Sequence, residues 1–469
     1  MLIRVSAGAW RRAWVALAVW SALGCGDPTG PVSAPAPELE MSVAAGRPEN
    51  VLSALVTART RFTDSARVRY GMAGETLDSV TPSVRASDGL IAVPVLGLLP
   101  QTAYRLQLVG FGRGGRVESE ILELTTAVLP DDLPSFQAGG PAPPPGYVVF
   151  AAGSYGLAID NTGRVVWYTR FDGGPGLNFQ PQANDRYIAR PATEDPSDIE
   201  PLVEVDPLGV VTRRLGCAGG LQPRFHDALV QADGGYWALC DETRVMDLST
   251  LGGMVGALVT GTVVQHLGPS GVLLFQWSPF DHFEIADLAA EARGGEKVNW
   301  THGNALDLDA EGNLLVSFRS LGEITRIDTH TGAVLWRMGG LRNQFTFPAG
   351  DPPFVGQHGV RAAPGGFVVL DNLGEITGTR AERYEIDDAS RSTRLTGWYH
   401  PAAATVAELG GAIQALPDGH MLVAFGSGAA VQEYDRGGRV VWQIEGDPGY
   451  VYRAQRIRSL YHPEEGLTR

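Results

Sequence analysis

A unit of strands and turns recurs along the last two-thirds of this 469-residue chain. Its closing phrase is a turn with glycine, an apolar pair and a tryptophan, found at 161–167, 329–336 and 436–442, with a weaker copy at 206–211. Repeats of about 40 residues that are rich in hairpins are typical of β-propellers, where each repeat forms one sheet of a ring. The pattern therefore predicts an all-β fold with a six-bladed β-propeller in residues 147–469.

Composition supports many short strands and argues against several functions. The 60 glycines, 31 prolines and 44% hydrophobic residues suit a protein built from hairpins. A net charge of −15 and a pI near 5.1 argue against nucleic acid as a partner, because phosphate backbones need a basic surface. Lys297 is the one lysine, so Schiff-base chemistry, which needs a positioned lysine, is not expected.

The first residues have the features of an export signal. Arg4, Arg11 and Arg12 precede an apolar stretch, 13–23, that is too short to span a bilayer stably. The stretch runs into Cys25 in a phrase that resembles the lipobox of bacterial lipoproteins. We expect residues 1–25 to be a lipoprotein signal peptide, Cys25 to become lipidated, and the protein to be exported to the periplasm or cell surface on a membrane anchor. An ordinary signal peptide with a chance cysteine is the alternative.

Two segments with different composition follow the signal. Residues 26–37 are rich in Pro, Gly, Ser and Ala and predict a flexible tether. Residues 38–127 predict a small Ig-like β-sandwich. The phrase 98–108 resembles the fibronectin type III pattern, in which a tyrosine hydrogen-bonds back across a corner of the sandwich. Tyr104 is the tyrosine expected to make this bond.

A Pro-rich linker is expected at 128–146, before the repeats begin. Because it separates two patterns of different period, we expect a chain that starts near Gly146 to fold by itself. The last segment, 452–457, is then placed to supply the missing strand of the first blade and to close the ring.

Cys217 and Cys240 are the two cysteines outside the signal. An exported compartment permits a disulfide between them. Two buried free thiols are the alternative, because a disulfide requires Cα atoms that come close together in the fold.

Three histidines stand at the same place in their repeats. His226, His302 and His358 each precede a Gly-containing hairpin and a strand-like apolar stretch. In a radial architecture, equivalent positions in different blades converge on one central channel. Each histidine alone would be interpreted as a structural residue. Together with Arg319, which lies one hairpin after His302, they predict a functional site.

Further phrases surround these histidines in a fixed order. They are Trp277-x-x-x-Asp-His282, the Ser-Phe-Arg-Ser phrase around Arg319, a Trp-Arg-Met-Gly-Gly phrase at 336–340, and Asp371-Asn372. This ordered set, over roughly 224–461, resembles the bacterial arylsulfate sulfotransferase family, especially its second branch. The resemblance implies a six-bladed propeller that moves a sulfuryl group between phenols without a nucleotide sulfate donor. Small-molecule aryl sulfates and phenols are the partners that it implies.

The resemblance also implies roles for individual residues. The nucleophile is His358; the supporting catalytic residues are His226, His302 and Arg319; the expected substrate contacts are His282, Asn304 and Asn372. Neutral imidazole is a competent nucleophile near pH 7, because its unperturbed pKa is about 6.5. A covalent sulfohistidine divides the transfer into two easier steps, which gives a ping-pong mechanism. A guanidinium offers a fixed fork of donors to sulfonate oxygens.

Two other functions are compatible with the pattern. Three histidines and an open position make a catalytic zinc site, so a metal-dependent hydrolase or lyase is one alternative. Arg319 argues against it, because a nearby cation opposes a metal ion. A non-enzymatic propeller that binds glycans or proteins is the other. We expect no metal and no other cofactor, and the sequence indicates no oligomeric state.

Overall fold

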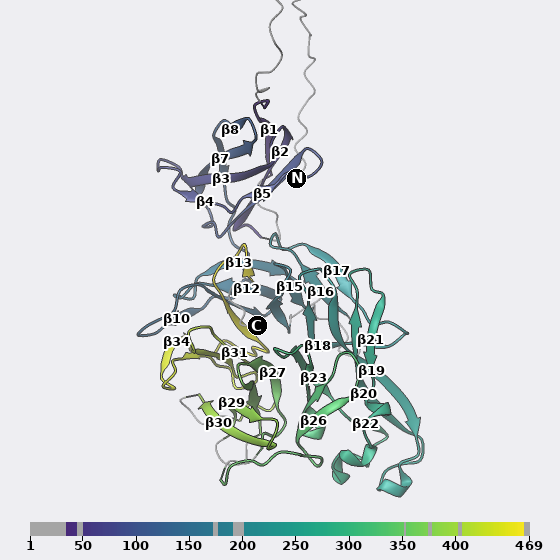
Figure 1. The fold of residues 1–469 in the computed structure, drawn as a ribbon. Helices are drawn as coiled ribbons and strands as arrows, with labels where there is room; N and C mark the ends of the chain where they lie inside the picture. Colours follow the sequence, from purple (N-terminus) through teal and green to yellow (C-terminus); the bar gives the residue numbers. More distant parts are fainter. Residues whose placement is uncertain are drawn as a thin grey trace, which may run out of the picture.

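The computed structural model describes residues 34–44, 50–171, 177–190, 201–350, 353–373, 378–401 and 406–463. The predicted signal peptide, Cys25 and most of the tether lie outside these residues. The described chain is all-β and is built almost entirely from antiparallel sheets, as predicted (Figure 1). Within it, no helix has the length and apolar character that crossing a membrane requires.

The N-terminal part of the described chain consists of two sheets that share one apolar core. Its strands are β1 Glu38–Ala44, β2 Ser53–Arg61, β3 Ser65–Met72, β4 Ser79–Val80, β5 Val84–Arg85, β6 Leu90–Leu96, β7 Ala103–Gly112, β8 Gly115–Glu118 and β9 Leu122–Thr125. One sheet has the order β1-β2-β6; in the other, β4-β3-β7-β8, β5 also pairs with β3 and β9 with β7. Alternate residues such as Val56, Val93 and Leu106 are buried between the sheets. The Tyr104 hydroxyl accepts a hydrogen bond from the Leu99 N–H at 2.9 Å, which is the corner contact that we expected.

Residues from Gln137 onwards form six sheets of four or five strands in the described chain. The first sheet contains β11 Tyr147–Ala152, β12 Tyr155–Ile159, β13 Val165–Arg170 and β35 Ala454–Ile457; the second, β14 Phe179–Pro181, β15 Tyr187–Ala189, β16 Leu202–Val205 and β17 Val211–Leu215; the third, β18 Gln222–Val230, β19 Tyr236–Met246, β20 Ala257–Leu267, β21 Leu273–Trp277 and β22 Lys297–Asn299. The fourth sheet contains β23 Gly303–Leu308, β24 Leu314–Phe318, β25 Glu323–Ile327 and β26 Val334–Gly339; the fifth, β27 His358–Ala363, β28 Gly366–Asp371, β29 Arg380–Asp387 and β30 Ser392–Tyr399; the sixth, β31 Ala412–Ala415, β32 Met421–Ala424, β33 Val431–Tyr434, β34 Val440–Glu445 and β10 Gln137–Gly139. Short 3-10 helices occur in the connections: η1 Ser249–Leu251, η2 Pro279–Asp281, η3 Ile285–Asp287, η4 Ala290–Ala292 and η5 Arg319–Leu321.

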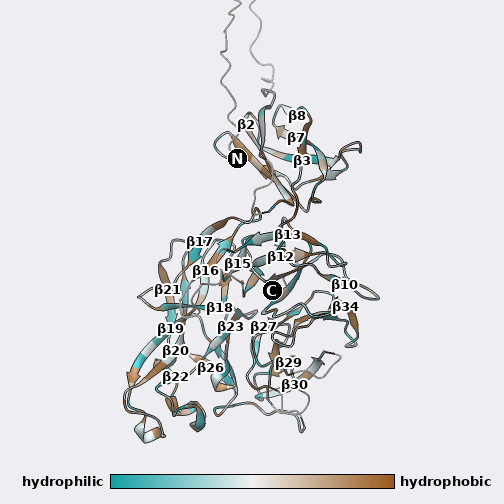
Figure 2. Ribbon diagram, turned by 180° about the vertical axis from the view of Figure 1, so that it is seen from behind, coloured by the Kyte–Doolittle hydropathy of each residue, from teal (hydrophilic) through white to brown (hydrophobic). Residues whose placement is uncertain are grey.

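Apolar cores between consecutive sheets arrange them in a propeller-like ring. Five clusters of buried apolar residues each join one sheet to the next along the chain. A sixth cluster joins the sixth sheet back to the first and contains Trp442 and Phe150. The edge strand β23 contacts both β18 and β27, and all three lie near the middle of the ring in the views from the front and from behind (Figures 1 and 2).

Two strands from distant parts of the chain close this ring. β35 pairs antiparallel with β11, in a register that places Ile457 opposite Tyr147, so the prediction that the C-terminal segment completes the first sheet is confirmed. β10 pairs with β34 and extends the sixth sheet. β10 lies inside the segment 128–146 that the sequence presented as a linker. A chain that starts at Gly146 would therefore lack a strand of the sixth sheet.

The N-terminal sheets are joined to the ring by specific contacts. The Val51 N–H donates a hydrogen bond to the Tyr168 hydroxyl at 3.1 Å, and Leu52 is fully buried in the core between the first and sixth sheets. The Leu96 N–H donates to the hydroxyl of Tyr461 at 2.9 Å. These contacts use residues from both ends of the described chain, so the N-terminal sheets are packed against the ring and not merely tethered to it.

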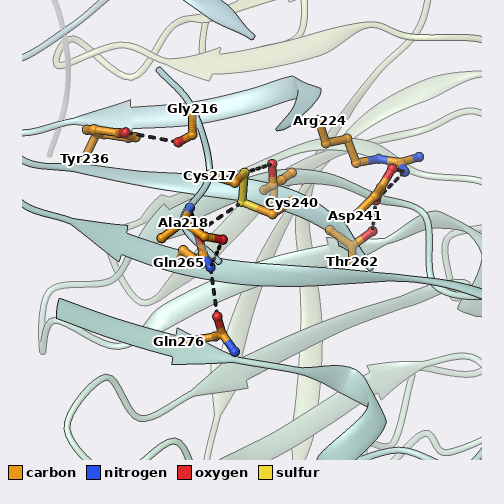
Figure 3. Close-up of a disulfide and its surroundings, with 11 residues drawn as sticks. Gly216, Cys217, Ala218, Arg224, Tyr236, Cys240, Asp241, Thr262, Gln265 and Gln276 are labelled. Atoms are coloured by element: carbon orange, nitrogen blue, oxygen red, sulfur yellow. Dashed lines mark hydrogen bonds and ion pairs between the residues drawn. A yellow bond between two sulfur atoms is a disulfide. The ribbon is translucent and has the colours of Figure 1, made fainter. Parts of the chain in front are cut away.

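A disulfide joins Cys217 to Cys240, which resolves the alternatives that the sequence left open (Figure 3). The two Cα atoms are 6.2 Å apart. Cys240 lies in β19, next to Asp241, whose carboxylate binds Arg224. The bond therefore fixes the segment after β17 against the third sheet, near residues that approach the middle of the ring.

Removing this disulfide is expected to lower stability without changing the fold. A link across 23 residues of sequence restricts the unfolded chain and contributes about 3 kcal/mol to the free energy of unfolding. We expect the double variant Cys217→Ser, Cys240→Ser to lose about this amount in urea denaturation. The wild-type protein measured with and without reductant is the matched control. An unchanged midpoint in both comparisons would show that the bond is not formed in solution.

Candidate active site

The three histidines of the sequence pattern come together at the middle of the ring. His226 lies in β18, His302 directly precedes β23, and His358 is the first residue of β27. The ring centroids of His226 and His302 are 5.1 Å apart. The charge interactions that shift the pKa of His226 include both His302 and His358. Equivalent positions in three consecutive sheets thus converge, as the repeat predicted.

The hydrogen bonds of His358 determine which of its ring nitrogens carries the proton. Its Nδ1 lies 2.8 Å from Oδ1 of Asn372. The Nδ2 of Asn372 donates to the carbonyl oxygens of Ala407 and Gly410, at 2.7 and 2.9 Å, so the amide oxygen is the atom that faces His358. His358 Nδ1 is therefore the donor, and the lone pair is on Nε2. A buried imidazole held in this tautomer has its nucleophilic nitrogen ready for reaction.

His302 is held in the opposite tautomer on an unusual backbone. Its Nδ1 lies 2.8 Å from Nδ2 of Asn299, which is a donor, so the proton is on Nε2. The backbone of His302 has φ of 49°, in the left-handed region that side chains other than glycine rarely adopt. Bonds on both sides hold it there: Gly303 N–H donates to Thr262 Oγ1 at 2.9 Å, and Arg319 N–H donates to the His302 carbonyl at 3.0 Å. Such maintained strain is frequent at functional sites.

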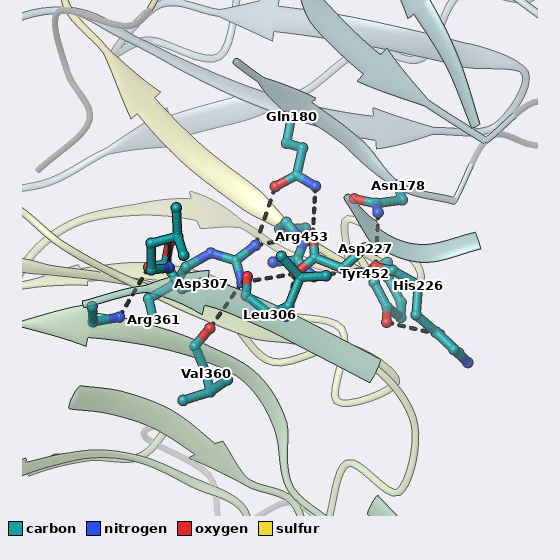
Figure 4. Close-up of polar contacts among 12 residues, drawn as sticks. Asn178, Gln180, His226, Asp227, Leu306, Asp307, Val360, Arg361, Tyr452 and Arg453 are labelled. Atoms are coloured by element: carbon teal, nitrogen blue, oxygen red, sulfur yellow. Dashed lines mark hydrogen bonds and ion pairs between the residues drawn. The ribbon is translucent and has the colours of Figure 1, made fainter. Parts of the chain in front are cut away.

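His226 is bonded to a tyrosine from the other end of the chain. Its Nδ1 lies 2.9 Å from the hydroxyl of Tyr452, a buried residue just ahead of β35 (Figure 4). The Tyr452 ring also meets the His358 ring edge-on, with centroids 6.4 Å apart. Tyr452 therefore contacts two of the three histidines.

Arg319 provides positive charge to the cluster. It begins η5, directly after β24, and its charge lowers the pKa of both His302 and His358. Its Nη2 donates to the Glu408 carbonyl at 3.3 Å, and its Nε is buried without a partner. Among the described residues no carboxylate forms an ion pair with it. An arginine with free donors beside imidazoles is a suitable site for an anion.

All three imidazoles are neutral at neutral pH. Burial, with the charge of Arg319, lowers the pKa of His358 to about 4, although the bond to Asn372 partly opposes the shift. Burial and the charges of Arg224 and Arg319 lower the pKa of His302 to about 2. Burial and Arg224 lower the pKa of His226 well below its usual value. The cluster therefore offers a free lone pair and N–H donors, while the formal positive charge is on the arginines.

A buried polar network lies next to His226 (Figure 4). Asp227 follows His226 and accepts hydrogen bonds from Arg361 at 2.8 and 3.2 Å, and Arg453 lies 3.6 Å from the same carboxylate. Gln180 donates to Asp227 at 2.9 Å. Burial alone would raise the pKa of Asp227, but the two arginines outweigh it and lower it. The network joins β14, β18, β27 and the C-terminal segment, and so fixes the strands that carry the histidines.

The expected substrate contacts are placed differently from one another. Asn372 and Asn304 are fully buried behind the histidines: Asn372 holds His358, and Asn304 Nδ2 donates to the Gln357 carbonyl at 2.6 Å. The Oδ1 of Asn304 is buried without a partner. His282 is exposed and stacks on Trp277 at the end of β21, with ring centroids 5.1 Å apart. Among the described residues, the ring contact of His282 is with Trp277 and not with any of the three histidines.

Sequence reasoning missed three residues near the histidines. Tyr452 and Arg453 belong to the closing segment, and Arg224 stands two residues before His226, where Asp241 holds it at 2.8 and 2.5 Å. The equivalence of repeats could have found Tyr452, since it precedes β35 as His302 precedes β23. No pattern in the sequence pairs Arg224 with Asp241.

The zinc alternative requires a group of side chains that face one metal position. Within the described ranges, no group of three or more His, Cys, Asp or Glu side chains is positioned to hold a metal ion. The Nδ1 atoms of the three clustered histidines are within hydrogen-bond distance of Asn372, Asn299 and Tyr452.

Part of the chain matches a known protein family. A model of the family described as arylsulfotransferase (ASST) matches residues 223–447, the stretch that contains the three histidines and Arg319. No curated protein matches the chain in sequence. Similar solved structures include a Bacteroides caccae protein of unknown function, 13% identical with a TM-score of 0.43 over 67% of this chain and 100% of that chain. They also include a streptogramin B lyase, at 13% and 0.39 over 69% and 88%, and the selenomethionine-substituted virginiamycin B lyase of Staphylococcus aureus, at 10% and 0.38 over 68% and 87%. By this match, residues 223–447 of the chain are similar to the arylsulfotransferase family.

Proposed function

We propose that this protein transfers a sulfuryl group from an aryl sulfate to a phenol through a sulfohistidine on His358. The observation that carries the proposal is the hydrogen bond from His358 Nδ1 to Asn372. It leaves the Nε2 lone pair free next to Arg319, an arginine with no carboxylate partner among the described residues. A nucleophile beside an unpaired cation suits an anionic electrophile such as a sulfate ester.

In the first step, His358 Nε2 attacks sulfur in line with the aryl oxygen. The S–O bond to the aryl group breaks, and the phenolate leaves with the electron pair. The enzyme is left with an N-sulfo imidazolium, whose positive charge balances the sulfonate. Arg319 donates its fork to the sulfuryl oxygens, and His302 donates Nε2–H to the leaving oxygen, where negative charge develops.

In the second step, a phenol attacks the same sulfur and the N–S bond breaks. The electron pair returns to His358 Nε2, and the proton of the attacking phenol passes through solvent to the phenolate released earlier. The net change converts one aryl sulfate and one phenol into the other phenol and the other aryl sulfate. Asn372 keeps the proton on Nδ1 throughout, so each cycle begins with the same tautomer.

The proposed enzyme is a six-bladed β-propeller, residues 147–469, preceded by a fibronectin III-like sandwich at 38–127. The six sheets and the six cores that link them in a cycle support the blade count. The Tyr104 corner contact supports the class of the sandwich. Strand β10 places part of the segment 128–146 in the sixth sheet, and Leu52 of the N-terminal part is packed in the core between the first and sixth sheets.

The same proposal places the enzyme outside the cytoplasm, on a membrane anchor. The Cys25 phrase and the preceding apolar stretch support lipidation, and the Cys217–Cys240 disulfide is compatible with an oxidising compartment. Fractionation of cells that express wild-type protein and Cys25→Ser distinguishes the alternatives. The variant should leave the membrane fraction; if it still sediments with membranes, the anchor is not at Cys25.

The experiment that tests the chemistry is intact-mass measurement after mixing with 4-nitrophenyl sulfate. The protein should gain the mass of one sulfo group, and a phenol such as 1-naphthol should remove it. A chelator should change neither step, whereas a metal-dependent hydrolase would lose turnover and never form the adduct. Failure to form an adduct while 4-nitrophenol is released would replace the ping-pong mechanism with direct transfer or hydrolysis.

The pH dependence should report the lowered pKa of His358. The imidazole loses its lone pair as pH falls through its pKa, and kcat/KM reports the free enzyme. Because that pKa is lowered to about 4, kcat/KM for the aryl sulfate should stay level from pH 7 to about 5 and fall only near 4. An unperturbed histidine would lose activity near about 6.5. An acid limb centred there would contradict the buried, neutral environment of the nucleophile.

A further inference from the structure

Arg190 occupies a position in its sheet that is equivalent to the positions of Arg319 and Asn372 in theirs. Arg319 directly follows β24 and Asn372 directly follows β28, each the second strand of its sheet counted from the middle of the ring. Arg190 directly follows β15, the second strand of the second sheet. Because the sheets repeat around the ring, Arg190 lies at the same end of its sheet as Arg319 and Asn372.

Short contacts link Arg190 to the histidine strand. Its Cζ lies 4.0 Å from the centroid of the Phe225 ring, and that ring is 4.2 Å from the ring of His226. The backbone N–H of Arg190 donates a hydrogen bond to the backbone carbonyl of Asn178 at 3.1 Å. The Nδ2 of Asn178 donates in turn to the His226 carbonyl at 2.9 Å. Arg190 is thus fixed to the edge of the cluster, one aromatic ring away from His226.

The charge of Arg190 is not compensated by the described residues. Two other arginines of the same sheet, Arg186 and Arg213, both pair with Glu204, at 3.0 and 2.8 Å. Arg190 has no carboxylate partner in the described part of the chain, and its Nε is buried without a hydrogen bond. Burial lowers the pKa of Arg190, with no acidic group opposing that effect. A half-buried cation with unsatisfied donors lowers the stability of the folded state, unless a ligand supplies the missing hydrogen-bond acceptors.

We propose that Arg190 and Phe225 form a second anion subsite beside the sulfuryl site. The preferred ligands would be aromatic sulfates or phenols that carry a further anionic group, such as a carboxylate, on the ring. Phe225 holds the guanidinium in place by stacking, and the guanidinium fork suits bidentate binding of a carboxylate. This inference rests on the proposed function, because it assumes that the sulfuryl group binds at His358 and Arg319.

The test is equilibrium binding of two inert sulfonates, 4-sulfobenzoate and benzenesulfonate, measured by calorimetry. Their sulfur is bonded to carbon and cannot be transferred, so binding is measured independently of turnover. The wild-type protein should bind the carboxylated ligand about tenfold more tightly, as expected for one charge-assisted pair. In Arg190→Gln this ratio should fall to near one. In Arg190→Lys, which retains the charge but loses the fork, it should be intermediate.

The matched control is Arg439→Gln, which removes an exposed arginine from the turn before β34 and should leave the ratio as in the wild type. Thermal unfolding of each variant checks that the fold is intact. A wild-type ratio near one, a ratio that survives in Arg190→Gln, or no binding of either sulfonate would overturn the subsite. If the ratio behaves as expected but no aryl sulfate is turned over, the proposed function fails while the anion subsite stands.

Discussion

Replacing His358 with alanine is expected to abolish both sulfuryl removal from an aryl sulfate and formation of the protein adduct. The lone pair on Nε2 is the group that bonds to sulfur, and no neighbouring side chain can substitute for it. His302 carries its proton on Nε2 and has an even lower pKa, and His226 is tied to Tyr452. We expect a loss of at least roughly 10³-fold in kcat, the scale seen when a nucleophile is removed. Release of 4-nitrophenol and intact mass measure the two effects.

Three comparison variants separate the nucleophile from its neighbours. His226→Ala and His302→Ala should still form the adduct, but more slowly, because neither removes the bond-forming atom. For His302→Ala, which removes the donor to the leaving oxygen, we expect a loss of roughly 10² to 10³ in rate. His330→Ala changes an exposed histidine in the turn after β25 and should behave as the wild type. Peptide mapping of the wild-type adduct gives an independent answer. A sulfo group on any residue other than His358, or a fully active His358→Ala, would disprove the assignment.

Deleting residues 450–469 is expected to prevent folding of the ring. The deletion removes β35, so β11 becomes an exposed edge and the core between the first and second sheets opens. It also removes Arg456, which binds the fully buried Glu433 at 2.5 Å, and Arg453, which lies beside Asp227. Removing one partner of a buried ion pair costs about 3–5 kcal/mol, which is a large fraction of the stability of a typical domain. The truncated protein should aggregate or show no cooperative thermal transition.

The control for this deletion ends at Pro463 and keeps every described residue. It should unfold at the same temperature as the full chain. Circular dichroism during heating, together with gel filtration, compares the three proteins. If the chain that ends at Gly449 unfolds cooperatively at the wild-type temperature, then β35 does not close the ring in solution.

The repeat made the site predictable in outline. Trp167, Trp336 and Trp442 close their repeats in the sequence and are buried between sheets in the structure, as packing residues of a repeating unit should be. His226, His302 and His358 hold equivalent places in consecutive repeats, and equivalent places in a ring face the same centre. Periodicity therefore carries three-dimensional information that a single histidine does not.

Phrases without this periodicity were less informative. His282 stands in a phrase of the family pattern, but it follows the outer strand β21, and its ring contact is with Trp277 and not with the other histidines. Strand β10 lies in a segment rich in proline, and its three residues pair with β34 only because the ring brings that edge to them. Neither the place of His282 nor the pairing of β10 could be assigned from local sequence, because both depend on the neighbouring strand in the folded chain.

The sequence by itself determined the all-β class, the repeating unit and the convergence of three histidines, because these follow from spacing along the chain. Only the tertiary structure decided their chemistry. Asn372 sets the tautomer of His358, and burial beside Arg319 keeps its imidazole neutral. Tyr452 reaches His226 across 226 positions of sequence, and the Cys217–Cys240 bond joins the segment after β17 to β19. Hydrogen-bond partners, burial and local charge depend on which side chains meet in space, and only the closed ring brings these residues together.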